Sequence, residues 1–236
     1  MTGRAGARSD SVRIVLAALA GLAVALAAGG CAAFDRGAHG PAVMPPGDYA
    51  FPGETLEDWV SYGDQLSVVS VLDSTGPETP RDYKDQGGLI GRTITIRVDR
   101  TLWRRAGAHA LRGRTRIQAW GWMMESDQVP DSPRRPIVVE GAPRMEVGRR
   151  YLAVLVRSHG EWSPLTDGAV MTVDDSGVVT SAVPAGDPVP GAAALRGRTV
   201  AGAGAVLART APDPVAARHF DLPPPARYRA VARAHG

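Results

Sequence analysis

Within residues 92–99, RTITIRVD, polar and apolar side chains alternate with a two-residue period from Thr93 to Asp99. Ile94, Ile96 and Val98 share one side of this segment, and threonine, arginine and aspartate occupy the other. Because successive side chains of a β-strand point to opposite faces, the pattern predicts a strand with one face in a core and the other in water. The single cysteine, Cys31, cannot form an intramolecular disulfide, so an apolar core has to stabilise the fold.

Several other short segments have the apolar or β-branched composition of strands. They are residues 65–72, 115–123, 136–140, 151–156, 170–173 and 178–180. The last two flank Asp174-Asp175-Ser176-Gly177, which predicts a hairpin loop with glycine at its end. Six or seven short strands at this spacing favour a small antiparallel barrel or sandwich.

Short helices are predicted on both sides of the strands. Thr55 and Asp58 have the spacing of a capping box and would begin a helix that ends near Tyr62. Three further helices are predicted after the strands, at residues 199–210, after the Asp213-Pro214 pair, and at 225–232. Helices this short are marginal alone, so they should pack on the barrel. The predicted fold class is mainly β: a small OB-like antiparallel β-barrel with a short N-terminal helix and short C-terminal helices.

The amino terminus has the composition of an export signal. Arg4, Arg8 and Arg13 precede an apolar run at residues 14–28. Fifteen helical residues span about 22 Å, which is less than the hydrocarbon core of about 30 Å. A cleaved signal is therefore favoured over a permanent membrane span.

Cys31 directly follows the signal and two glycines, Gly29 and Gly30. This arrangement resembles a bacterial lipobox, in which the cysteine is acylated and becomes the first residue, although Ala28 stands where that motif usually has leucine. The alternatives are an ordinary cleavage site beside a chance cysteine and an uncleaved signal anchor. The expected organisation is an export signal at 1–30, a Gly- and Pro-rich tether at 31–53, a barrel at 54–182, and a linker with a C-terminal helical segment at 183–236. The expected location is the outer face of the cytoplasmic membrane.

Three segments carry a resemblance to a known fold. They are DQLSVVSV at 64–71, GRTITIRVDRTLW at 91–103 and EVGRRYLAVL at 146–155. Together they resemble bacterial secreted proteins with a netrin/TIMP-like, OB-type barrel, and the chain is similar to uncharacterised lipoproteins of high-GC Gram-positive bacteria. This resemblance implies the fold and no activity. In metalloproteinase inhibitors of this fold, a disulfide-bonded N-terminal cysteine chelates zinc, a mechanism that a chain with one cysteine does not share.

Positive charge is concentrated at residues 100–157, which contain twelve arginines and five acidic residues. Five of these arginines lie within thirteen residues: Arg104, Arg105, Arg112, Arg114 and Arg116. Guanidinium groups bind phosphate or carboxylate in a bidentate manner, so an anionic cell-wall polymer or a lipid headgroup is a candidate partner. A solvated strand connection is the ordinary alternative. From Cys31 onward the net charge is only +1, which gives no argument for nucleic-acid binding.

Trp120 and Trp122 flank Gly121 in a predicted strand. If the strand is regular, both indoles point to one face and would form a stacking platform for sugars or bases. The alternative is that the pair fills the core, because large aromatic residues dominate core burial.

The chain lacks the common catalytic and metal-binding motifs. Ser158 and His159 are adjacent, but neighbouring side chains at a strand end should point apart, so His159 is interpreted as a solvated loop residue. The predicted function is a non-enzymatic binding or interaction module without a metal or cofactor. The alternatives are an envelope hydrolase with an unrecognised site and a structural partner of another envelope protein.

Replacing the candidate lipidation residue tests the predicted anchor. Cys31→Ala removes the only thiol that can be acylated, so we expect the protein to be released from the membrane or to retain its signal. Mass spectrometry of the wild-type amino terminus measures the modification directly, and an unmodified Cys31 would contradict the prediction.

Overall fold

The computed structural model describes residues 40–47, 52–76, 88–125, 133–180 and 183–235. Cys31, the predicted signal and the first part of the predicted tether lie outside the described residues. Within the described part, two long antiparallel strands, β2 (Gln65–Thr75) and β3 (Leu89–Arg104), are the centre of the fold. Both strands include the residues that the sequence pattern predicts, and both are longer than predicted.

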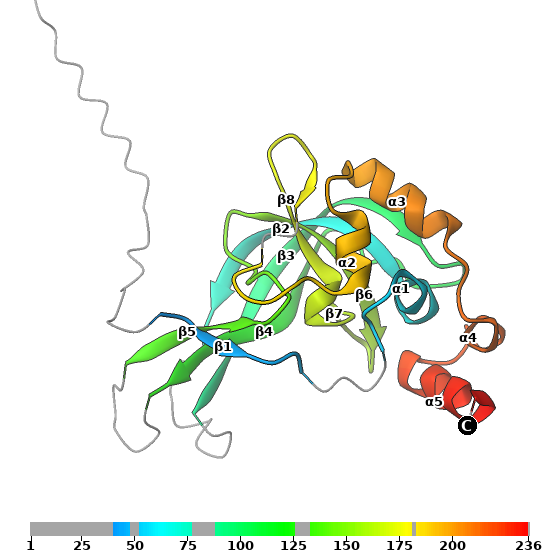
Figure 1. Ribbon diagram of the computed structural model, residues 1–236, viewed down its shortest axis with the longest axis horizontal. Coiled ribbons are helices and arrows are strands. Elements are labelled where there is room, and N and C mark those ends of the chain that lie inside the picture. Colours follow the sequence, from blue (N-terminus) through cyan, green and yellow to red (C-terminus); the bar gives the residue numbers. More distant parts are fainter. Residues whose placement is uncertain (1–39, 48–51, 77–87, 126–132, 181–182, 236) are drawn as a thin grey trace, which may run out of the picture. The chain divides into compact units, whose positions relative to one another are not determined.

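The strands form one curled sheet that is open on one side, a half-barrel (Figure 1). Its order is β1 (Ala42–Met44), β5 (Arg134–Val139), β4 (Arg114–Met124), β3, β2, β6 (Arg150–Ser158), β8 (Val170–Val173) and β9 (Val179–Thr180), and β7 (Glu161–Pro164) also pairs with β6. All pairs are antiparallel except β1 with β5, which is parallel. The mainly β fold class is thus confirmed.

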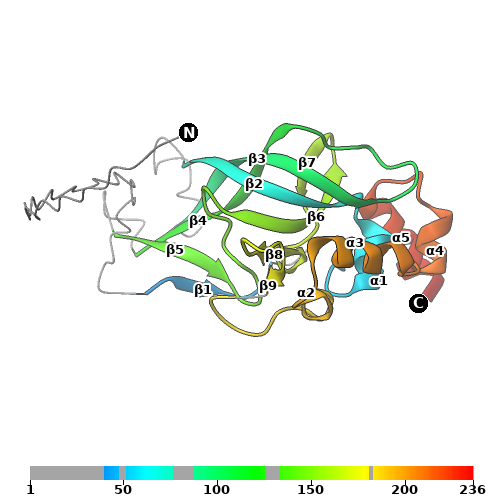
Figure 2. The ribbon, with the colours of Figure 1, turned by 90° about the horizontal axis from the view of Figure 1, so that it is seen from above.

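The helices gather over one end of the sheet (Figure 2). They are α1 (Leu56–Tyr62), α2 (Pro190–Leu195), α3 (Val200–Arg209), α4 (Pro214–Arg218) and α5 (Pro224–His235), with a 3-10 turn, η2, at Asp167–Ala169. The capping box of Thr55 and Asp58 is present, and Asp213 caps α4, as predicted. No described helix is long and apolar enough to cross a membrane.

The core has two layers because β2 and β6 are buried on both faces. On the concave face, Val71, Ile94 and Ile96 pack with Tyr151 and Leu155. On the opposite face, an apolar cluster joins the sheet to α1, α2 and α3; it includes Trp59, Leu66, Val68, Leu152, Val154, Leu195 and Leu207. The continuous apolar sequence of β6 follows from this position between two packed layers.

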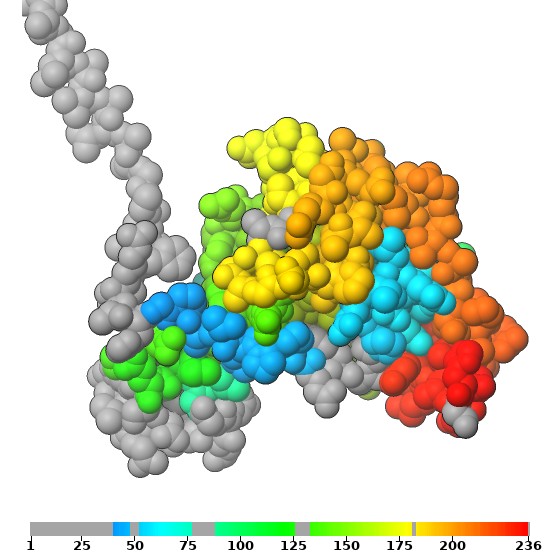
Figure 3. Space-filling view, viewed as in Figure 1, coloured from blue at the N-terminus to red at the C-terminus, as the bar shows by residue number. Residues whose placement is uncertain are grey.

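The predicted tether contains a strand that the sequence pattern did not indicate. Ala42–Met44 pairs with Ile137–Val139, and Arg135 donates hydrogen bonds to the carbonyl oxygens of Gly40 and Pro41. In Figure 3 this segment, coloured blue, lies against the green strands. A strand of three residues has no measurable periodicity, so only its pairing reveals it. The barrel therefore includes residues before position 54, and α2 occupies part of the predicted linker.

Ile96 and Thr95 test the assignment of the strand faces. Ile96 is fully buried and Thr95 is partly exposed on the other face. Ile96→Ala should lower the free energy of unfolding by about 2–5 kcal/mol, because it leaves a cavity in the core. Thr95→Ala should cost far less. Denaturant titration measures both values, and equal losses would show that the faces are wrongly assigned.

Candidate functional site

The five arginines of the predicted anion site do not form one cluster. Arg112, Arg114 and Arg116 are exposed in the loop before β4 and on β4 itself. Arg104 is exposed at the end of β3, seven residues from Arg97, which corresponds to about 23 Å along a strand. Arg105 is buried, so its assignment to a surface site was wrong.

Arg105 instead forms an ion pair with buried Asp64. Its Nη2 lies 2.6 Å from Asp64 Oδ1, and the two side chains are 8% and 6% exposed. Arg105 also donates to the carbonyl oxygens of Gly63 and Phe220, and its guanidinium lies 4.8 Å from the centre of the Phe220 ring. The sequence gives no sign of this role, because Asp64 and Phe220 are far away in the chain.

A row of exposed arginines crosses the sheet on its convex face. Arg114 on β4 pairs with Arg97 on β3, Arg97 pairs with Ser70 on β2, and Ser70 pairs with Arg150 on β6. Directly opposed residues of antiparallel strands have side chains on the same face, about 5 Å apart. We call Arg97, Arg114, Arg150 and the neighbouring Arg116 the arginine face.

Most of the positive charge of the arginine face is not neutralised by the chain. Arg97 forms an ion pair with Asp99, at 2.7 Å, and Arg150 donates to the backbone oxygen of Asp174. Arg114 and Arg116 form no ion pair with any described residue. The acidic group beside the row of Arg114 is Asp99, which accepts hydrogen bonds from Arg97 and Ser70. Asp99 balances the charge of Arg97, so the charges of the arginine face that lack an acidic partner among the described residues include those of Arg114 and Arg116.

Trp120 and Trp122 do not share a face. Trp122 pairs with Ile90 and Trp120 with Gly91, so one extra residue, Gly121, forms a bulge between them. Because Ile90 and Gly91 are consecutive, their partners point to opposite faces, and the predicted two-indole platform is not formed. The regular alternation of side chains in β4 does not continue across Gly121, because the bulge shifts the two-residue period by one.

The two indoles instead have separate polar partners. Trp120 Nε1 donates to Asp167 Oδ2 at 3.0 Å, which joins β4 to the turn before β8. The Trp122 ring lies 5.4 Å from the guanidinium carbon of Arg144.

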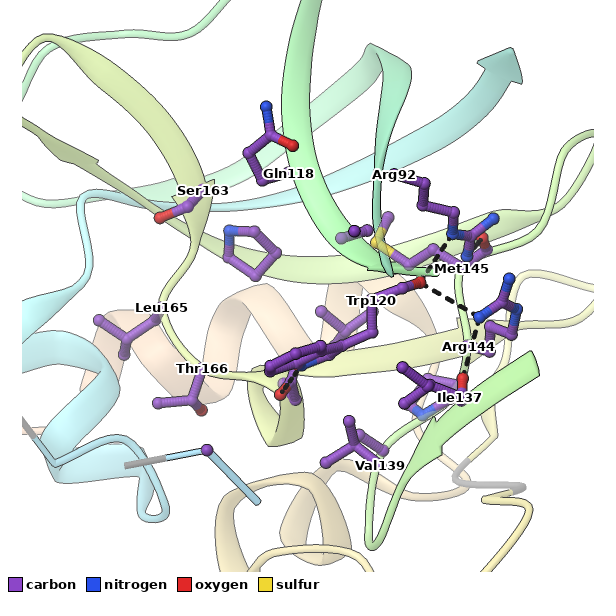
Figure 4. A pocket seen from close by; sticks show the side chains of 18 of the residues that line it. Arg92, Gln118, Trp120, Ile137, Val139, Arg144, Met145, Ser163, Leu165 and Thr166 are labelled. Carbon is purple, nitrogen blue, oxygen red and sulfur yellow. Dashed lines mark hydrogen bonds between the residues drawn. The ribbon is translucent and has the colours of Figure 1, made fainter. Parts of the chain in front are cut away.

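A pocket of about 750 Å³ lies at the open side of the half-barrel (Figure 4). Its walls come from β3, β4 and β5, from the segment before β6, and from β7 and the turn that follows it. Most of the lining is apolar, and the residues include Leu89, Ala119, Trp120, Ile137, Val139, Met145, Leu165 and Val170. Gln118, Ser163, Thr166 and Asp167 add polar groups, and Arg92 and Arg144 also line it.

Arg92 and Arg144 share acceptors at one end of the pocket. Arg92 Nε and Arg144 Nη1 both donate to the carbonyl oxygen of Trp120, at 2.9 and 3.1 Å. Arg144 Nη1 also donates to the carbonyls of Gly121 and Ile137, and Arg92 donates to that of Met145. These bonds tie the bulge of β4 to β3 and β5.

One carboxylate, Glu146, accompanies the two guanidinium groups. Its Oε1 accepts from Arg144 Nε at 2.6 Å, and its Oε2 lies 3.7 Å from Arg92 Nη1. Burial and, to a smaller extent, the nearby Arg144 charge lower the pKa of Arg92 to about 10, and Glu146 partly opposes this shift. Burial also lowers the pKa of Arg144. A group with a pKa of about 10 is still charged at neutral pH, so this end of the pocket has two positive charges and one negative charge.

The alternation of side chains in β3 already indicates that Arg92 is buried. Arg92 has the same parity as Ile94 and Ile96, so the strand pattern places it on the buried face, where it is 3% exposed. Arg144 had no comparable signal, because it lies in the connection before β6 and contacts residues of two other strands.

Ser158 and His159 do not point apart as expected. Ser158 Oγ lies 3.1 Å from His159 Nδ1, because His159 has a positive φ of 51° in the tight turn between β6 and β7. His159 is exposed, and within the described residues no acidic side chain hydrogen-bonds to its ring, so the third group of a triad is missing there. No group of three or more described His, Cys, Asp or Glu side chains is arranged to hold a metal ion.

Comparisons of the chain with protein-family models, curated proteins and solved structures find no match. Only the geometry of the two candidate sites, the arginine face and the pocket, therefore indicates what they bind.

Arg104 and Arg105 are a matched pair for testing the structural role of the buried arginine. Arg105→Ala should lower the free energy of unfolding by about 3–5 kcal/mol, because it leaves the Asp64 carboxylate buried without its partner. Arg104→Ala, one residue away and exposed, should change it by less than about 0.5 kcal/mol. Chemical denaturation measures both, and a small effect at Arg105 would contradict the buried ion pair.

Proposed function

We propose that the protein is a non-enzymatic, lipid-anchored binding module at the outer face of the cytoplasmic membrane, and that its arginine face binds an anionic cell-wall polymer. The anchor is supported by the signal-like amino terminus and by Cys31, as the sequence indicates. The described part of the body that would be presented begins at residue 40.

The exposed charge of the arginine face carries the polymer proposal. Arg114 lies directly opposite Arg97, and both side chains are exposed. Neither Arg114 nor Arg116 has an acidic partner among the described residues. A repeating anion can contact several of these guanidinium groups together. Guanidinium also matches phosphate and carboxylate geometry better than ammonium does. The membrane-proximal location expected from the sequence would bring this face to the cell wall.

The test is co-sedimentation of residues 36–236 with purified Gram-positive cell wall at several salt concentrations. Binding should weaken as salt rises, because displaced counterions and screened charges supply most of the affinity. Arg114→Ala combined with Arg116→Ala should reduce the pelleted fraction and lower the slope of log affinity against log salt by about two. Stability should change little, since both side chains are exposed and form no ion pair with any described residue.

Arg229→Ala combined with Arg233→Ala is the matched control. Both residues are exposed on α5, so the control loses the same charge elsewhere on the protein. It should retain nearly all of the binding. If the two double variants lose binding equally, net charge and not the arginine face is responsible; if salt has no effect, the polymer proposal fails.

A further inference from the structure

The pocket at the open side of the half-barrel is a second site, separate from the arginine face. β3 and β4 build both, but Ile94 and Ile96 belong to the apolar cluster beside the pocket, whereas Arg97 and Arg114 lie on the opposite face. The pocket and this cluster share Ala119, Met145 and Val170. A ligand in the pocket would therefore contact residues of this cluster together with Gln118 and Trp120, which have the parity of Arg114 on β4.

The size and lining of the pocket fit a small molecule with an apolar body. A volume of about 750 Å³ lies within the range of about 300–1,000 Å³ of small-molecule sites, which often occur in the mouths of β-barrels. Leu89, Ile137, Val139, Leu165 and Val170 supply apolar surface from three separate parts of the sheet. An apolar chain would replace water in contact with these side chains.

Trp120 lies between the positive end of the pocket and Asp167. Its carbonyl oxygen accepts from Arg92 and Arg144, while its indole Nε1 donates to Asp167 (Figure 4). An anionic group would be attracted toward the two guanidinium groups. The charge distribution therefore gives a bound amphipathic molecule one orientation.

The positive end has both a surplus charge and a free donor. Two guanidinium groups face one carboxylate, Glu146. The hydrogen bonds of Arg144 come from Nε and Nη1, and Nη2 donates to no described residue. Arg144 lines the pocket, and its side chain is 10% exposed. A nearly buried charge of this kind is stabilised by an anion.

We infer that the pocket binds an amphipathic anion, with its apolar chain between β4, β5 and β7 and its acidic headgroup at Arg144. The headgroup chemistry is a carboxylate or a phosphate monoester, both of which accept hydrogen bonds from a guanidinium group.

Isothermal titration calorimetry of residues 36–236 with four ligands of equal chain length tests the inference. Dodecanoate and dodecyl phosphate distinguish the two headgroups, and dodecanol and dodecylamine are the neutral and cationic controls, all used below their micelle concentrations. At least one anion should bind about tenfold more tightly than dodecanol, the size expected for one charged hydrogen bond, and dodecylamine should bind weakest. Equal affinity for dodecanol and both anions, or no binding of any ligand, would overturn the inference.

Two substitutions should change anion affinity in opposite directions. Arg144→Gln should lower it about tenfold, and Glu146→Gln should raise it several-fold by removing the competing carboxylate. A purely structural role for this cluster would make both variants bind less. If Glu146→Gln reduces anion affinity while the protein remains folded by circular dichroism, the headgroup site is wrong.

A pocket-filling variant covers the case in which Arg144→Gln does not fold. Leu89→Trp places a larger side chain on the pocket wall and should abolish binding, whereas Val147→Trp, at an exposed position outside the pocket, should not. Retained binding in folded Leu89→Trp protein would place the ligand elsewhere. The Arg114→Ala, Arg116→Ala protein should bind the anion normally, so this result is independent of the polymer proposal.

Discussion

Among the described residues, three arginines are almost completely buried, and the need of each for hydrogen-bond acceptors determines which segments meet. Arg227, Arg92 and Arg105 are 0%, 3% and 8% exposed. A buried guanidinium group without acceptors costs several kcal/mol, so each has to gather backbone oxygens or a carboxylate. Arg92 joins β3 to the bulge of β4 and to the segment before β6, and Arg105 joins the end of β3 to Asp64. No described buried side-chain nitrogen or oxygen is left without a partner.

The same requirement explains how the C-terminal helices dock. Arg227 on α5 donates to the carbonyl oxygens of Ser61, Leu222 and His219, so it contacts α1 and the segment after α4 together. Phe220 lies between Arg227 and Arg105, 5.2 and 4.8 Å from their guanidinium carbons. Burial lowers the pKa of Arg227 to about 10, a value at which it remains charged at neutral pH. The helices are thus held by polar groups around an aromatic ring as well as by apolar contact.

The elements that the sequence predicted correctly are those whose information is local. The alternation around Ile96 and the caps at Thr55 and Asp213 each depend on residues within one strand or one turn, and the structure confirms them. The errors concern partners that are distant in the chain or a break in the period. Arg105 looked like a surface charge because Asp64 is forty-one residues away, and the bulge at Gly121 separated two indoles that regular alternation places together. The pocket is a product of the sheet's curvature, which no single segment encodes.

The placement of the two candidate sites follows from how one pair of strands distributes its residues. Every second residue pair between β3 and β4 contributes to the concave core, and the alternate pairs face solvent. Ile94 therefore opposes Ile117 in the core, and Arg97 opposes Arg114 at the surface. The bulge at Gly121 then changes the parity where β4 approaches β5. Trp122 consequently changes face, whereas Trp120 keeps the parity of Arg114 and donates to Asp167. The Trp120 carbonyl, next to the bulge, accepts from Arg92 and Arg144. A regular strand would pair that carbonyl with a neighbour, so the irregularity that defeats the sequence pattern also creates the charged end of the pocket.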